Sequence, residues 1–106
     1  MDINQVVQQA QQFQKRMADV QDDMAGRQLT STVGGGMVTV TVNGKNELLA
    51  LKIDSMIINP EDPNMLQDLI VAGVNDAMRK AREAMQAEMQ KLTGGLNIPG
   101  LSGMFG

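Results

Sequence analysis

The chain has 106 residues, enough for one domain, and its net charge of -3 argues against binding nucleic acid through overall positive potential. Cysteine and histidine are absent, which excludes disulfides, thiolate metal sites and nucleophile–histidine pairs. Only two residues are aromatic and ten are methionine, so we expect an aliphatic core in which methionines pack and do not bind metal.

Residues 2–24 carry apolar residues at alternating steps of three and four, a spacing typical of a helix that packs along another helix. The seam consists of Ile3, Val6, Ala10, Phe13, Met17, Val20 and Met24. Gly26 is expected to end this helix in the left-handed conformation.

The period then changes to two, which predicts strands around residues 29–33, 38–42 and 47–54. In the third strand, Leu49, Leu51 and Ile53 are expected to share one face. The glycines at 34–36 and the Asn43-Gly44 pair can adopt positive φ, so the strands should form an antiparallel meander. A phosphate-binding glycine loop is disfavoured at 34–36 because a strand follows it.

A turn at residues 59–63 precedes a second long helix, with Asp62 as its cap and Pro63 as its first residue. Its apolar stripe runs to about Leu92 and consists of Leu66, Ile70, Val74, Met78, Ala81, Met85, Met89 and Leu92. The fold class is therefore α+β, with one domain at residues 1–93 and a flexible glycine-rich tail at residues 94–106.

The two helices are too long for such a sheet. Helices of about 23 and 29 residues span roughly 35 and 43 Å, whereas a seven-residue strand spans about 23 Å. Much of each apolar stripe would be exposed in a single copy, and this predicts a homodimer.

Basic residues cluster off the apolar stripes. Arg79, Lys80 and Arg82 are expected to point outward from the second helix as phosphate contacts. The alternative is a solvated face with intrahelical ion pairs, because Asp76 and Glu83 lie three and four residues from Arg79. Further candidate DNA contacts are Lys15 and Arg16 on the first helix, near Asp19, and Arg27 after its end.

Three stretches resemble one known family. They are residues 34–44 (GGGMVTVTVNG), residues 65–77 (MLQDLIVAGVNDA) and residues 94–100 (GGLNIPG). Together they resemble the YbaB/EbfC nucleoid-associated proteins. The resemblance implies an α-β-β-β-α protomer, an intertwined homodimer with projecting helices, and DNA binding with little sequence preference. It also favours the phosphate-contact interpretation of Arg79, Lys80 and Arg82.

The leading hypothesis is a bacterial, cytoplasmic, nucleoid-associated homodimer that binds double-stranded DNA, organises the chromosome and modulates transcription. Neither tryptophan nor tyrosine is present to stack on unpaired bases, so single strands are not expected as targets. We expect no enzyme activity, cofactor, metal, small-molecule substrate or membrane partner. The alternative is an acidic, dimeric protein-interaction module that serves replication, repair or recombination proteins.

Overall fold

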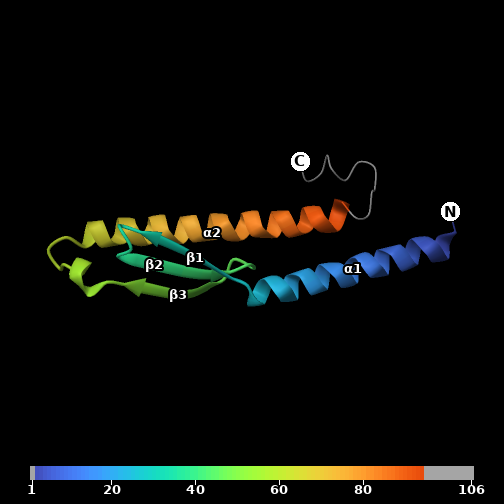
Figure 1. Cartoon of the computed structure of the whole chain (residues 1–106), viewed down its shortest axis with the longest axis horizontal. Helices are drawn as coiled ribbons and strands as arrows, with labels where there is room; N and C mark the ends of the chain where they lie inside the picture. The colour runs from blue at the N-terminus through green and yellow to red at the C-terminus, as the bar shows by residue number, and fades with distance from the viewer. Residues whose placement is uncertain (1, 95–106) are drawn as a thin grey trace.

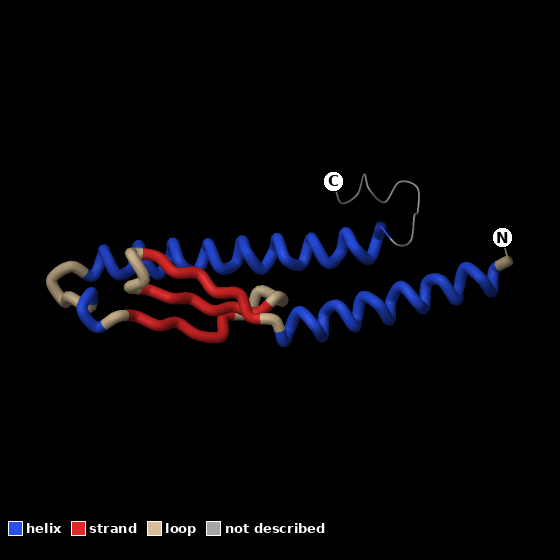
Figure 2. Tube along the Cα trace, viewed as in Figure 1, coloured by secondary structure: helices blue, strands red, loops and turns tan. Residues whose placement is uncertain are grey.

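The computed structural model describes residues 2–94 and confirms the α+β protomer, with its α-β-β-β-α order (Figure 1). The elements are α1 at Ile3–Gly26, β1 at Gln28–Val33, β2 at Val38–Asn43, β3 at Leu48–Ile53, the short 3-10 helix η1 at Ser55–Ile57, and α2 at Pro63–Gly94. The tail predicted at residues 94–106 lies outside the described residues, except for Gly94, which ends α2. Figure 2 shows that the strands lie at one end of an elongated molecule and the helices extend beyond them.

The three strands form the predicted antiparallel meander, in the order β1-β2-β3. The first turn is as expected, because Gly34, Gly35 and Gly36 all have positive φ. The second turn differs: positive φ occurs at Asn46 and not at Asn43-Gly44. The reason is a longer turn, in which the Asn43 side-chain oxygen accepts hydrogen bonds from the backbone N–H groups of Lys45 and Glu47, both at 3.0 Å.

Strand β3 corrects the predicted side-chain alternation. Val42 pairs with Leu48 and Val40 pairs with Leu51, so one extra residue, Leu49, forms an irregularity in the ladder. Paired residues share a face of a sheet, and a bulge shifts this alternation by one residue. The face that carries the buried valines of β2 therefore continues through Leu48, Leu51 and Ile53. The predicted alternation had omitted Leu48 from this face, because it did not include a bulge, in which two residues of one strand oppose one residue of the other.

Helix α2 begins at Pro63 as predicted, and the Asp62 carboxylate accepts a hydrogen bond from the Met65 N–H at 3.4 Å. The helix covers the β1 and β2 half of one sheet face (Figure 1). The fully buried core consists of Val38, Val40, Val42, Ala77 and Ala81, with Leu66, Leu69 and Val74 packed against it.

The predicted stripe on α2 omitted its most closely packed position. Gly73 is buried, and a Cβ atom placed on it would lie only 2.9 Å from Val40 Cγ2. Ile70 and Met78, which the stripe included, lie beside this contact and are half-buried. Small residues let α2 lie close to the sheet, so Gly73, Ala77 and Ala81 form the contact line.

Helix α1 extends past the end of the sheet (Figure 1). Of its apolar seam only Met24 is buried; Phe13, Met17 and Val20 are half-buried, and Ile3 is 77% exposed. Gly26 lacks the predicted left-handed conformation, because the chain passes through an extended Arg27 directly into β1. Helix α1 is joined to the sheet where the Gly44 N–H donates to the Met24 carbonyl oxygen at 2.8 Å.

Candidate nucleic-acid interface

A polar cluster joins α2 to β1 around Asp76. The buried Ser31 hydroxyl donates to Asp76 Oδ2 at 2.6 Å, and Arg79 donates to Asp76 Oδ1 at 2.5 Å. The Ser31 hydrogen bond and then the Arg79 hydrogen bond lower the pKa of Asp76, because both stabilise its charged form. Arg79 also donates to Glu83 Oε1 at 2.9 Å. Arg79 is thus paired on both sides within its own helix.

Lys80 does not point away from the core as predicted. Its ammonium group donates to the Thr30 carbonyl oxygen on β1 at 2.9 Å and lies 3.7 Å from Asp76 Oδ2. The Lys80 side chain is 40% exposed, and its charge lies beside the edge strand β1 of the sheet. The structure therefore contains the ion pairs of the alternative interpretation at Arg79, and Lys80 adds one with Asp76 that the interpretation did not name.

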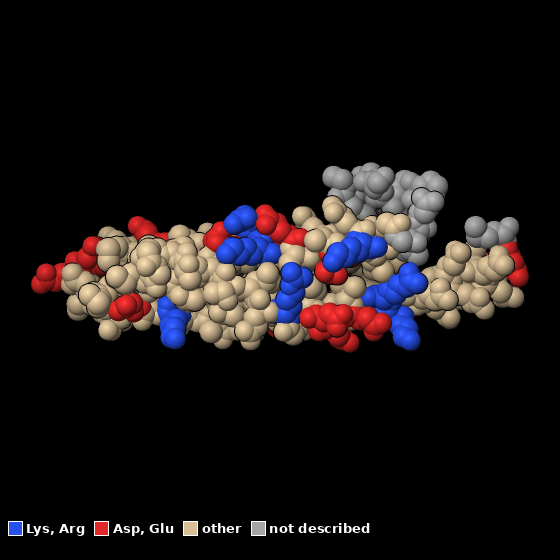
Figure 3. Space-filling view, viewed as in Figure 1, with Lys and Arg blue, Asp and Glu red and all other residues tan. Residues whose placement is uncertain are grey.

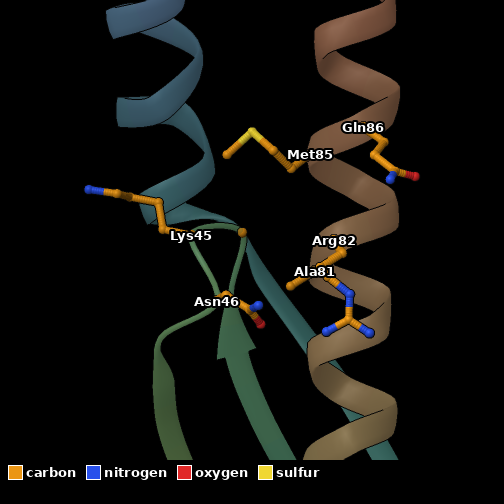
Figure 4. Close-up of a pocket in the computed structure, with 7 residues that line it drawn as sticks. Lys45, Asn46, Ala81, Arg82, Met85 and Gln86 are labelled. Carbon is orange, nitrogen blue, oxygen red and sulfur yellow. The ribbon is translucent and has the colours of Figure 1, made fainter. Parts of the chain in front are cut away.

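Arg82 lies in a different setting, beside the turn between β2 and β3. A groove of about 290 Å³ separates this turn from α2. Its polar lining comes from Lys45, Asn46, Arg82 and Gln86, and its apolar floor comes from Ala81 and Met85. In Figure 4, Asn46 points toward α2, the Arg82 guanidinium lies at the same level, and Lys45 extends from the outer side of the turn.

The remaining predicted contacts lie around the junction of α1 with α2. Arg16 lines a second hollow, of about 310 Å³, together with Asp19, Asp23, Glu88 and Lys91. Arg27 forms an ion pair with Glu88 at 3.7 Å. Lys15 is exposed on α1. Arg16 and Arg27 are near carboxylates, and neither lines the groove beside Arg82.

Figure 3 shows most cations over the middle of the molecule, where acidic side chains lie among them, and further acidic side chains at the end where α2 begins. The prediction missed Lys45 and Asn46 because the two residues are separated from Arg82 by more than 30 positions of sequence. The only available signal was their place in a turn after a strand, which does not say which helix lies opposite. Over residues 2–94, no group of three or more acidic side chains is placed to hold a metal ion. Neither α1 nor α2 is apolar enough over a sufficient length to cross a membrane.

The fold defines a small α+β protein in which a three-stranded meander follows one long helix in sequence and is covered on one face by a second. The same architecture occurs in an uncharacterized protein from Helicobacter pylori, with a TM-score of 0.81, 27% identity, and coverage of 88% of this chain and 98% of that chain.

The chain belongs to the YbaB/EbfC DNA-binding family, which matches residues 1–96. A nucleoid-associated protein of Clostridium acetobutylicum is 50% identical over 93% of this chain and 88% of its own length. Another, from Desulfotalea psychrophila, is 47% identical over 96% of each chain. The predicted family and fold are therefore confirmed, and the protein is a member of a bacterial nucleoid-associated, DNA-binding family.

Proposed function

We propose that this protein binds double-stranded DNA as a homodimer with little sequence preference, and that it organises the chromosome in the cytoplasmic nucleoid and influences transcription. The observation that carries the proposal is the match of residues 1–96 to a DNA-binding family whose relatives are named nucleoid-associated proteins. The proposed role is binding alone, with no chemical step.

Uncovered apolar surface supports the homodimer. Helix α2 covers β1 and β2, whereas Leu48 and Leu51 of β3 remain 51% and 42% exposed on the same face of the sheet. The seam of α1 is also largely open, from Ile3 to Val6 and beyond. A second copy exposes the same leucines of β3 and the same seam of α1, so the two copies can cover these surfaces for each other. Burial of one leucine side chain contributes about 1.5–3 kcal/mol to the free energy of association.

Recognition through the DNA backbone fits the composition. The sequence has no tryptophan or tyrosine, and among residues 2–94 the only aromatic side chain is the half-buried Phe13, so this part of the chain offers little to stack on bases. Phosphate contacts add up, so local cations can outweigh a net charge of -3 when two copies bind together. We propose Arg82, Lys15 and Arg16 as contacts, joined by Arg79, Lys80 and Arg27 if these exchange a carboxylate for a phosphate.

The test is duplex binding by the full chain, measured by fluorescence anisotropy over a series of salt concentrations with several unrelated sequences. We expect similar affinities for all sequences and a steep decrease of affinity with salt. Absence of binding at low salt would refute the proposal, and a strong preference for one sequence would refute its non-specific character.

A role in serving replication or recombination proteins is tested separately, by capture from lysate treated with nuclease. Partners retained at wild-type levels by a variant that no longer binds DNA would favour the protein-interaction function. Loss of all partners with the nucleic acid would favour DNA binding alone.

A further inference from the structure

The cations of this protein differ in whether a carboxylate neutralises them. Four of the nine take part in ion pairs, and these are Arg27, Arg79, Lys80 and Lys91. Among residues 2–94, no ion pair is formed by Lys45 or Arg82, although they come from different elements and line the same groove. This groove therefore has positive charge that is available to a ligand.

The groove at the β2–β3 turn and the hollow near α1 differ in electrostatic character. The hollow near α1 combines Arg16 and Lys91 with three carboxylates, at Asp19, Asp23 and Glu88. The groove at the β2–β3 turn is lined by no carboxylate. Its other polar groups are carboxamides, whose N–H groups can donate hydrogen bonds to an anion.

The carboxylates nearest to the groove in sequence are already engaged. Glu47 accepts a hydrogen bond from the Asn43 side chain at 2.9 Å, and Glu83 accepts one from Arg79 at 2.9 Å. Neither of them forms an ion pair with Lys45 or Arg82. A phosphate that approaches Arg82 or Lys45 would thus not have to displace an ion-pair partner, unlike one that approaches Arg79.

The turn itself is held in place before any ligand binds. Two backbone N–H groups donate to the Asn43 side chain, and the Gly44 N–H donates to the carbonyl oxygens of Met24 and Arg27 at 2.8 and 3.1 Å. Asn46 has a φ of 67°, in the left-handed region that few side chains adopt. A fixed turn lowers the ordering cost of binding, because the contacting groups lose less freedom.

We propose that this groove is a contact site for the DNA phosphate backbone, with Arg82 and Lys45 as the ionic contacts and Asn46 and Gln86 as hydrogen-bond donors. The proposal rests on the proposed function and names the site within it. Lys45 and Arg82 diverge in Figure 4, so they would reach different phosphates of a strand that crosses the groove.

The test compares two double variants of the full chain that lose the same charge. The groove variant is Lys45→Gln with Arg82→Gln, and the control is Lys52→Gln with Lys91→Gln, which lie outside the groove. Each phosphate contact contributes about 0.9 to the slope of log affinity against log salt. Loss of two contacts in one groove lowers the slope by about 1.8, and loss of the same contacts in both copies of the dimer lowers it by about 3.6. From 50 to 200 mM salt the wild type should therefore lose about 12-fold more affinity than the groove variant if one groove contacts the duplex, and about 150-fold more if both do.

We expect this change in the groove variant and a smaller change in the control. A charge-conserving variant, Lys45→Arg with Arg82→Lys, should keep the wild-type slope, and circular dichroism verifies the fold of all three. A slope equal to wild type in the groove variant, or an equal loss in the control, overturns the site while the proposed function stands. Absence of duplex binding by the wild type at low salt overturns both.

Discussion

Replacing Gly73 with alanine should destabilise the protein, although alanine is the better helix former. The new Cβ would lie 2.9 Å from Val40 Cγ2 and 3.4 Å from Val33 Cγ2, whereas carbon atoms pack best at about 3.5–4.0 Å. Val40 is fully buried in the central strand and has little room to move. Helix α2 would therefore have to shift away from the sheet.

Two opposing contributions decide the magnitude. Helix propensity favours alanine by about 1 kcal/mol, and overpacking of a core costs about 1–3 kcal/mol. The net loss in free energy of unfolding should be about 1 kcal/mol, which for a domain of this size lowers Tm by about 4–8 °C.

The assay is urea denaturation at one protein concentration, with Gly26→Ala as the matched control. A Cβ on Gly26 would meet no atom within 4 Å, and Gly26 lacks positive φ, so that variant should gain about 0.4–1 kcal/mol. If Gly73→Ala is as stable as Gly26→Ala, α2 does not lie as close to the sheet as the structure shows.

Three further outcomes are expected. Gly44→Ala should lower Tm and increase proteolysis of α1, because the added Cβ would lie 2.8 Å from the Met24 carbonyl oxygen. An unchanged digestion pattern would show that the contact between Gly44 and Met24 does not hold α1 against the sheet. Asp76→Asn should lower stability at neutral pH. The folded-state pKa of Asp76 is lowered, so its ionised carboxylate stabilises the folded protein above about pH 4. This stabilisation is lost as pH falls through the lowered pKa, and the denaturation curves of wild type and Asp76→Asn should therefore converge in acid. Leu51→Glu should shift the protein to monomers in sedimentation equilibrium, because it places a charge on the uncovered apolar face; wild-type protein that is monomeric at micromolar concentration would refute the homodimer.

Much of the fold could be predicted because its signals are local. The change of apolar spacing from three and four to two separates α1 from the strands, and it depends only on which residues share a face of a helix or strand. The three glycines at 34–36, Asp62 and Pro63 act within their own turns, so the sequence also located the first hairpin turn and the start of α2.

The candidate site was harder to predict because a cation's partners come from other elements. The sequence placed Arg79 beside Asp76 and Glu83, and both pairs occur in the structure. It could not show that Lys80 reaches Thr30 on β1, because that contact depends on how α2 lies across the sheet.

The sequence by itself determined the order of elements, the family and the excess of apolar surface over what one copy can bury. Only the tertiary structure decided that Gly73 faces Val40, that Gly44 holds α1, and that Lys45 shares a groove with Arg82. The physical reason is range: periodicity and capping act over a few residues, whereas close packing and charge pairing depend on distances between elements that are remote in sequence.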